Sequence, residues 1–336
     1  MRVLVLGGTA FVGRAIVQAL LAAGHEVVLF GRGRTGADLF PGVRRSLGDR
    51  APGDYGSLAG TRWDCVVDVS AYVPRHVRQV LDALGVPGVD DAGEAPGGAR
   101  WPGRFGRYLL ISTGSVYDRL RAVPGLDEGS PRLAPRRDTE EVDEDTYGPL
   151  KVACEDEVLA RCGARATIVR PGVVAGPHDP TDRFTWWVRR AAAGGRLALP
   201  ADPDQPVQVV DSRDLAALVV ALLTAGRAGV YNAVGPEPAT TLAGLVRACA
   251  HAAGSEVEVV PVPPAALHPP LPLVAPDPSW VVMSQRSAAR ARAAGMPATA
   301  LTRTAADVLA WDRERGAPPL RVGPDAEVEA RLLAGR

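Results

Sequence analysis

The residues best suited to chemistry in this sequence are Tyr147 and Lys151, which stand four positions apart in Tyr-Gly-Pro-Leu-Lys. On a helix this spacing places both side chains on one face. An ammonium group close to a phenol is expected to lower the phenol's pKa, so Tyr147 would exchange a proton with a substrate alcohol or carbonyl near neutral pH. Lys151 is also the single lysine in a chain with 38 basic residues, so a compact ammonium was retained where arginine is otherwise used.

A cluster of hydroxyl side chains is the second candidate for chemistry. Ser112, Thr113 and Ser115 lie in YLLISTGSVYD, where an apolar run predicts a strand that ends at the hydroxyls. A hydroxyl at this place can donate a hydrogen bond to a carbonyl oxygen and polarise it. With Tyr147 and Lys151, these residues suit reactions that interconvert a carbonyl and an alcohol.

A glycine-rich turn near the start of the chain predicts a dinucleotide site. Residues 2–6 (RVLVL) predict a strand, and the apolar residues after the turn have helical spacing. Small residues between the two let backbone N–H groups reach a pyrophosphate, and the helix N-terminus favours its negative charge. Ala10 stands where the middle glycine of GxxGxxG is usual, and its methyl group is small enough for that place. The residues assigned to this turn are Gly7, Thr9, Ala10, Phe11, Val12 and Gly13.

The end of the second predicted strand favours a phosphorylated cofactor. NAD enzymes usually carry an acid there that accepts hydrogen bonds from the ribose 2′-hydroxyl, but this chain has Gly31 followed by Arg32, Gly33 and Arg34. Two guanidinium groups without a carboxylate suit a 2′-phosphate, so NADP(H) is favoured; a solvated arginine loop and NAD(H) stay open as the alternative. Just past the third strand, Asp49 is a candidate partner of the adenine amino group.

The elements that must position these residues alternate between strand and helix. Strands are predicted at 2–6, 25–30, 43–47, 64–69, 107–112 and 166–170, with helices after the first turn and at 74–84 and 147–161. This order predicts an α/β fold, a Rossmann-type doubly wound parallel sheet. We expect an NAD(P)-binding domain over residues 1–170. A Gly- and Pro-rich insertion is predicted at 86–104.

The second half of the chain predicts a smaller α/β substrate lobe over residues 171–336, with crossings between the two parts. The charged, Pro-punctuated segment 118–140 lies between catalytic segments and could close over substrate. Helices of the lobe are predicted at 182–194, 212–224, 240–253 and 300–312, and strands at 206–210, 229–232 and 256–260.

Composition excludes several classes of partner. The formal net charge is zero, so the chain lacks the basic field that non-specific nucleic-acid binding requires. No apolar stretch approaches membrane-spanning length, and the N-terminus does not resemble a secretory signal. The four cysteines lack CxxC spacing and His178 has no neighbouring ligands, so neither a disulfide framework nor a metal site is expected. A cytoplasmic protein without membrane or nucleic-acid partners fits best.

The motifs GGTAFVG, LGDR, ISTGSVY, YGPLK and RPGVVAGP resemble, in order and spacing, the extended short-chain dehydrogenases/reductases, the NAD-dependent epimerase/dehydratase superfamily. The resemblance spans residues 1 to about 235. It implies a Ser/Thr-Tyr-Lys triad of Thr113, Tyr147 and Lys151, with Ser112 as the substitute for Thr113. It also implies that Lys151 bonds the nicotinamide ribose. The further cofactor residues implied are Arg50, Val69, Ser70, Ala71, Pro171 and Val173.

Departures from the family pattern reduce the number of reactions that we expect this chain to catalyse. The dehydratases that this chain resembles carry Asp-Glu directly after the catalytic threonine, whereas this chain has Gly114 and Ser115, so dehydration is not expected. Nucleotide-sugar epimerases usually carry an arginine for the diphosphate where this chain has Val207. The asparagine that commonly completes the family's tetrad has no obvious counterpart in VPRHVRQVLDAL.

Candidates for substrate contact come from three segments. Aromatic and basic side chains in DPTDRFTWW suit a sugar-like or cyclic ligand, although Phe184 and Trp187 can equally belong to the core of the lobe. The residues assigned to substrate are Tyr72, Ser115, Arg183 and Trp186.

The sequence therefore predicts an NADPH-dependent ketoreductase acting on a sugar-like or cyclic secondary-metabolite ketone. The first alternative is an NAD(P)-dependent sugar epimerase, which uses the same triad but must retain its cofactor. The second is a non-catalytic nucleotide- or RNA-binding protein on the same fold. The expected partner is a small-molecule carbonyl or alcohol, and a homodimer is expected because it is common in the family.

Overall fold

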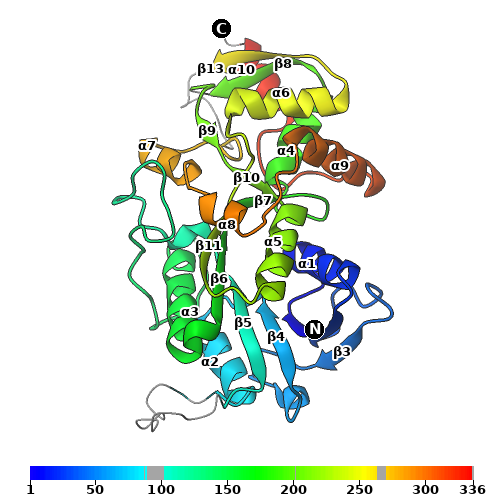
Figure 1. Cartoon of the computed structure of the whole chain (residues 1–336). Coiled ribbons are helices and arrows are strands. Elements are labelled where there is room, and N and C mark those ends of the chain that lie inside the picture. Colours follow the sequence, from blue (N-terminus) through cyan, green and yellow to red (C-terminus); the bar gives the residue numbers. More distant parts are fainter. Residues whose placement is uncertain (87, 89–101, 201, 263–269, 335–336) are drawn as a thin grey trace.

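The computed structural model describes residues 1–86, 88, 102–200, 202–262 and 270–334. Most of the insertion predicted at 86–104 lies outside the described residues. Within them the chain forms a parallel sheet flanked by helices and, above it in Figure 1, a second lobe built from the C-terminal half.

The main sheet has seven strands in the order β11-β6-β5-β4-β1-β2-β3, and all neighbours are parallel. The order reverses between β1 and β4. In doubly wound sheets a dinucleotide binds at the crevice beside such a reversal, where the loops after neighbouring strands part. The strands are β1 Arg2–Leu6, β2 Glu26–Gly31, β3 Arg44–Leu47, β4 Trp63–Asp68, β5 Phe105–Ile111, β6 Ala166–Pro171 and β11 Gly229–Ala233.

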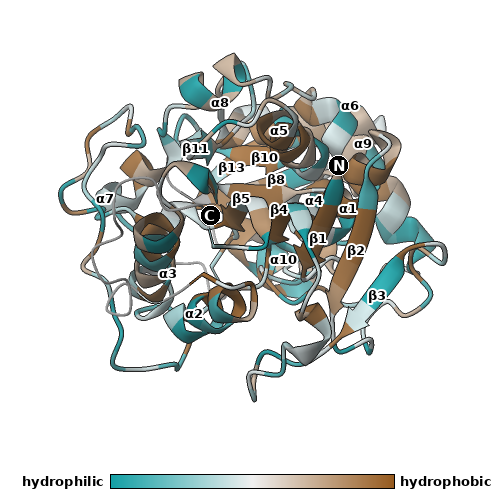
Figure 2. Ribbon diagram, turned by 60° about the horizontal axis from the view of Figure 1, so that its bottom comes forward, coloured by the Kyte–Doolittle hydropathy of each residue, from teal (hydrophilic) through white to brown (hydrophobic). Residues whose placement is uncertain are grey.

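Helices cover both faces of this sheet, which explains why its strands read as continuous apolar runs. Val3 and Val5 of β1 pack on the side of α1 and α5, whereas Leu4 and Leu6 pack on the side of α2 and α3. The central strands are correspondingly hydrophobic in Figure 2. The helices are α1 Phe11–Ala22, α5 Ser212–Thr224, α2 Pro74–Ala83 and α3 Tyr147–Cys162.

The C-terminal lobe has a core of its own around the buried Trp187. Its parallel pair β8 and β13 is covered by helices α4, α6, α9 and α10 (Figure 1). The elements are α4 Arg183–Ala192, β8 Gly195–Pro200, β9 Pro206–Val207, β12 Thr240–Thr241, α6 Leu242–Ala253, β13 Val257–Val262, α9 Leu301–Glu314 and α10 Ala326–Ala334.

The chain crosses between the two lobes several times. β7 Val173–Ala175 pairs with β10 Val209–Asp211, and β11 then returns to the edge of the main sheet. The strand predicted at 206–210 is thus two strands, β9 and β10, which belong to different sheets and are separated at Gln208. Segment 278–293 forms short helices that the sequence did not predict, namely α7 Pro278–Val281, η5 Val282–Ser284 and α8 Ala289–Ala293.

Three short 3₁₀ helices complete the described elements: η1 Gly56–Leu58, η2 Gly114–Val116 and η3 Gly163–Arg165. All four cysteines are buried and free. Among the helices of the described residues, none combines the length and apolar character needed to span a membrane.

Candidate active site

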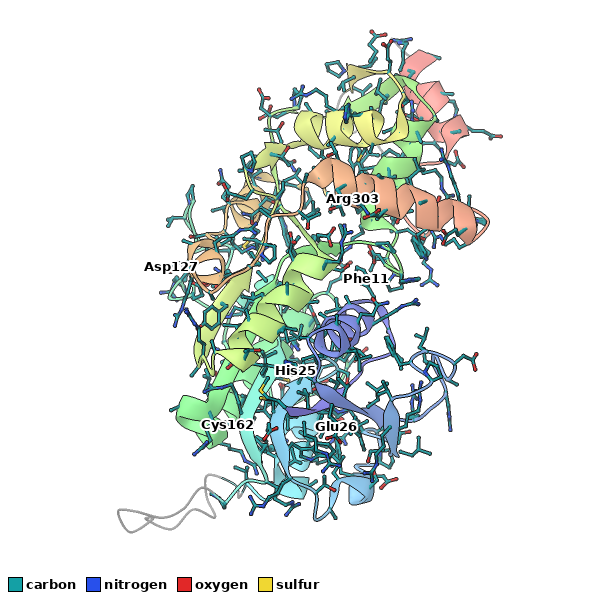
Figure 3. The ribbon with its side chains drawn as sticks, turned by 45° about the vertical axis from the view of Figure 1, so that its right-hand side comes forward. Phe11, His25, Glu26, Asp127, Cys162 and Arg303 are labelled. Atoms are coloured by element: carbon teal, nitrogen blue, oxygen red, sulfur yellow. The ribbon has the colours of Figure 1, made fainter. Side chains whose placement is uncertain are left out.

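The turn between β1 and α1 is shaped for close approach by a phosphate. Gly7 has φ +89°, and a Cβ at Gly13 would lie only 1.9 Å from the carbonyl oxygen of Gly7, so no larger residue fits at position 13. Helix α1 begins without a side-chain cap or an acidic residue in its first turn, which leaves its first N–H groups available to an anion. Figure 3 shows Phe11 at the end of α1 that faces the C-terminal lobe. These features fit a dinucleotide pyrophosphate.

The arginines predicted for the 2′-phosphate lie at the end of β2, beside a cavity of about 320 Å³ that also borders Asp49 and Ser70. Arg32 and Arg34 are both exposed, and within the described part of the chain neither makes a side-chain hydrogen bond or an ion pair. The loop that follows them is held by Arg45, whose guanidinium donates to three of its carbonyl oxygens, those of Gly36, Ala37 and Leu39.

Arg50, assigned to the cofactor from the family resemblance, is committed to a buried carboxylate. Its Nη1 and Nη2 atoms bond the two oxygens of Asp68 at 2.8 and 2.6 Å, and Nη1 also donates to Ser70 Oγ at 3.0 Å. Burial alone would raise the pKa of Asp68, but Arg50 and a hydrogen bond from Tyr108 hold it below its usual range. Arg50 therefore positions the Ser70 loop, and Asp68 is a structural residue that the sequence analysis did not identify.

The predicted triad is assembled in a cavity of about 690 Å³ that also contains the glycine-rich turn. Tyr147 begins α3 and forms a hydrogen bond with Thr113, whose Oγ1 also accepts from the backbone N–H of Ser115 at 3.1 Å. Ser112 instead donates to the buried Glu155 at 2.6 Å, so Thr113 is the hydroxyl placed beside Tyr147.

Lys151 lies one turn below Tyr147 and is almost completely buried. Its Nζ donates to the carbonyl oxygens of Ala71 at 2.7 Å and Ile111 at 2.8 Å, and burial lowers its pKa. The sequence predicted that the ammonium lowers the pKa of Tyr147. In the structure burial raises that pKa, and the hydrogen bond with Thr113 opposes the rise. The prediction was wrong in direction because it took no account of desolvation.

The remaining residues predicted to bind the cofactor lie at the ends of strands. Val69 and Ser70 after β4, Pro171 at the end of β6 and Val173 at the start of β7 all line the cavity. Ala71 is buried and contributes through the carbonyl oxygen that holds Lys151.

Three of the four residues predicted for substrate border the same cavity, namely Tyr72, Ser115 and Arg183. Trp186 does not: its side chain is 3 % exposed, and its indole N–H donates to the carbonyl oxygen of Pro324 within the core of the C-terminal lobe. The placement of Trp186 in the cleft was therefore wrong, because helix α4 turns its aromatic face towards α6 and α9 rather than towards the cavity.

The wall opposite the triad comes from residues that the sequence analysis missed. It includes Asp179, Gln208 and segment 273–286, with Trp280 and Arg286. Burial raises the pKa of Asp179, whose carboxylate accepts hydrogen bonds from Thr181. Segment 273–286 has neither helical nor strand periodicity, so no sequence pattern marked it.

Segment 118–140, considered as a cover for the substrate, is fixed to other parts of the fold. Backbone hydrogen bonds join Gly125 to Gln285 and Leu126 to Ser287, and Glu128 accepts from the backbone N–H of Asn232. In Figure 3, Asp127 lies beside the α7–α8 segment. Among the described residues that line the cavity, none comes from 118–140. Residues of segment 273–286 line the cavity instead, and backbone hydrogen bonds join segment 118–140 to the end of that segment.

Gly114 stands where the dehydratases that this chain resembles carry aspartate, and the Arg286 guanidinium lies next to it. A Cβ at Gly114, the position where the resembling dehydratases carry aspartate, would lie 1.3 Å from Nη1 of Arg286. The guanidinium of Arg286 thus occupies the space that a side chain at position 114 would need.

Comparisons with known proteins identify the family to which the chain belongs. The profile of the NAD dependent epimerase/dehydratase family matches residues 3–234. The chain is 26 % identical over 277 residues to the chloroplast stem-loop binding protein of 41 kDa b of Arabidopsis thaliana, a match covering 77 % of this chain and 65 % of that protein. It is 28 % identical over 238 residues to 2′-dehydrokanamycin reductase of Streptomyces kanamyceticus, covering 68 % and 59 %. The chain thus spans just under two thirds of the length of these relatives.

Solved structures share the fold at low sequence identity. UDP-glucuronic acid 4-epimerase from Bacillus cereus, in complex with NAD, superposes with a TM-score of 0.67 at 16 % identity, covering 95 % of this chain and 99 % of that one. Human epimerase family protein SDR39U1 (isoform 2), with NADPH, superposes with a TM-score of 0.60 at 21 % identity, covering 92 % and 99 %. The family match over more than half of the chain identifies this protein as a member of the NAD dependent epimerase/dehydratase family, of the extended short-chain dehydrogenase/reductase type.

Proposed function

We propose that this protein is an NADPH-dependent ketoreductase that acts on a sugar-like or cyclic ketone. The observation that carries the proposal is the pair Arg32 and Arg34, exposed and unpaired within the described residues at the end of β2. Guanidinium groups in that place suit a 2′-phosphate, and NADPH is the usual reductant of biosynthetic ketoreductases that release their cofactor each cycle. The reductase activity named for the Streptomyces relative is in accord with it.

The triad can supply the proton that reduction requires. The bound reduced nicotinamide would supply the hydride for the ketone carbon. Because burial raises the pKa of Tyr147, its phenol stays protonated at neutral pH and can donate to the developing alkoxide. Thr113 lies within hydrogen-bonding reach of the same oxygen position and orients it. Lys151, fixed by two backbone carbonyls, places a positive charge below the tyrosine.

Epimerisation would use the same side chains, and two features weigh against it as the principal reaction. An epimerase must hold its cofactor through both half-reactions, whereas Arg32 and Arg34 lie in an open, exposed loop. Val207, where nucleotide-sugar epimerases usually carry an arginine, is apolar and 2 % exposed, so it offers no diphosphate contact. For the non-catalytic alternative, a nucleotide- or RNA-binding protein, there is the name of the Arabidopsis relative, a stem-loop binding protein. Against it stand the zero net charge and the assembled triad.

The first test is isothermal titration of the nucleotide-free protein with NADPH and with NADH, repeated on Arg32→Ala. We expect NADPH to bind at least about tenfold more tightly, and Arg32→Ala to remove most of that preference, since a charge-assisted hydrogen bond is worth about 1.5–3 kcal/mol. Arg247→Ala, which removes an exposed arginine on α6, is the matched control and should change neither affinity. Equal or preferential NADH binding, or NAD⁺ that cannot be removed, would place epimerisation first.

A further inference from the structure

Arg286 lines the active-site cavity with a fixed backbone, and within the described residues its side chain has no partner. The amide of Gln208, between β9 and β10, donates to the Arg286 carbonyl at 2.8 Å and accepts from the Arg286 N–H at 3.1 Å. This pair of bonds ties segment 273–286 to the strand junction. The Arg286 side chain is thereby carried into the cavity that contains Thr113, Tyr147 and Lys151.

The glycines around Arg286 locate its guanidinium group. A Cβ at Gly114 would lie 1.3 Å from Nη1, and a Cβ at Gly172 would lie 3.1 Å from Nη2. Gly114 directly follows Thr113, and Gly172 lies in the loop after β6. The positive charge therefore sits between the loop of the catalytic hydroxyl and the loop after β6, next to the place where a ketone must lie to reach Tyr147.

This charge is not balanced by the chain. Within the described residues no ion pair or side-chain hydrogen bond reaches the guanidinium, and its Nε is enclosed without a partner. Burial accordingly lowers the pKa of Arg286 to about 10. By contrast, Arg170 is paired with Glu155 and Arg50 with Asp68. Arg286 is half-buried, and a charge largely withdrawn from water is normally compensated, so we expect the missing counter-charge from a bound molecule.

The cofactor is a poor source of that counter-charge. Its phosphates fit the turn from Gly7 to Gly13 and the arginines after β2, whereas the nicotinamide end, beside Tyr147 and Lys151, carries no anionic group. The substrate remains as the ligand that can bring an anion to Arg286.

We propose that Arg286 is a substrate-positioning residue that binds an oxyanion, in the first instance a carboxylate, carried by the ketone that Tyr147 protonates. The proposal rests on the proposed function and specifies its substrate class as an acidic ketone. A guanidinium presents two parallel N–H donors to a carboxylate, which fixes both the position and the orientation of the substrate. A glycine at position 114 leaves room for the guanidinium, because a side chain there would displace it.

The test compares matched ligands by isothermal titration, both without cofactor and with saturating NADP⁺, which prevents turnover. The carboxylate pair is 3-oxocyclohexanecarboxylate and its methyl ester, and the phosphate pair is dihydroxyacetone phosphate and dihydroxyacetone. We expect the wild-type protein to bind the carboxylate at least about tenfold more tightly than the ester. A larger preference within the phosphate pair would identify the oxyanion as a phosphate.

Three variants separate the role of Arg286 from a structural one. Arg286→Met should abolish the preference for the charged ligand, Arg286→Lys should keep part of it, and Gly114→Ala should weaken it by displacing Nη1. NADP⁺ affinity should stay unchanged in all three. Arg286→Met should also keep or raise the melting temperature, since it removes an unpaired charge, whereas loss of a structural arginine would lower it. Arg247→Met on α6 is the control for the change in net charge.

Several outcomes would overturn the proposal. These are a charged-ligand preference that persists in Arg286→Met, an equal affinity for charged and neutral members of both pairs in the wild type, or a fall in NADP⁺ affinity in Arg286→Met. A failure of the proposed function would look different. In that case NADP⁺ would not bind or no ketone would be reduced, while the cofactor-free titrations would still report on Arg286.

Discussion

At the scale of single residues, burial decides how the catalytic groups ionise. Lys151 and Tyr147 are both desolvated, and desolvation favours the neutral form of each. The pKa of the lysine is lowered from 10.5 and that of the tyrosine is raised from 10.0. The two shifts have opposite signs, and the lysine is the group that loses its proton at a lower pH than it would in water.

The lowered pKa of Lys151 predicts where the rate of ketone reduction falls at alkaline pH. Reduction needs the protonated phenol and the charged ammonium, so kcat/KM should fall at a pH below 10.5 as Lys151 deprotonates. The pH profile of NADPH-dependent reduction measures this limb. Lys151→Arg should move it to higher pH because a guanidinium keeps its proton. Tyr147→Phe should lower kcat about 10²–10⁴-fold at every pH. An alkaline limb that is the same in wild type and Lys151→Arg would show that Lys151 does not set it.

At the scale of elements, the contact between the β1–α1 turn and the helix behind it determines the cofactor site. Gly13 lies in the first turn of α1, directly against the carbonyl of Gly7. An alanine in a helix is ordinarily favourable by about 1 kcal/mol relative to glycine. Here the added methyl would lie 1.9 Å from a backbone oxygen, so the clash outweighs the gain in propensity.

We therefore expect Gly13→Ala to destabilise the protein by about 1–3 kcal/mol and to weaken NADPH binding severely. Urea unfolding and cofactor titration measure the two effects. Gly42→Ala is the matched control, because a Cβ at Gly42 meets no atom within 4 Å. Unchanged NADPH affinity in Gly13→Ala would show that this turn does not hold the pyrophosphate.

At the scale of the whole molecule, the two lobes are joined through Asp211. This residue ends β10 and caps α5, which packs on the main sheet, and its carboxylate accepts from Arg213 at 2.6 Å. The same carboxylate accepts from the hydroxyl of Thr304 on α9, in the C-terminal lobe, at 2.6 Å. The lobe that carries the substrate wall is thus fixed to the lobe that carries the triad. The oligomeric state of the protein stays a prediction, namely that it forms a homodimer.

Thr304→Val tests this connection with little change in shape. It should cost about 1–3 kcal/mol of the free energy of unfolding, because it removes a buried hydrogen bond to a charged acceptor. Thr302 lies two residues before Thr304 on α9 and makes no side-chain hydrogen bond in the described part of the chain. Thr302→Val should therefore lower the free energy of unfolding by less than about 0.5 kcal/mol. Equal effects of the two substitutions in urea unfolding would mean that the Asp211 contact does not stabilise the junction.

The sequence alone determined the doubly wound sheet, and it identified the glycine-rich turn after β1 and the residues proposed as the triad, because each of these features depends on local pattern. Apolar runs, glycine spacing and the four-residue step from Tyr147 to Lys151 are all set by neighbours in the chain. It did not determine the ionisation of Tyr147, the orientation of Trp186 or the substrate wall.

Those features were decided by contacts between distant segments. The pKa of Tyr147 depends on what buries it, and the direction of Trp186 depends on which helices pack against α4. Arg286 lies 172 positions after Gly114 in the sequence, yet its guanidinium fills the space that a side chain at Gly114 would need. No periodicity in the sequence indicates this contact, because the two residues come together only in the folded chain.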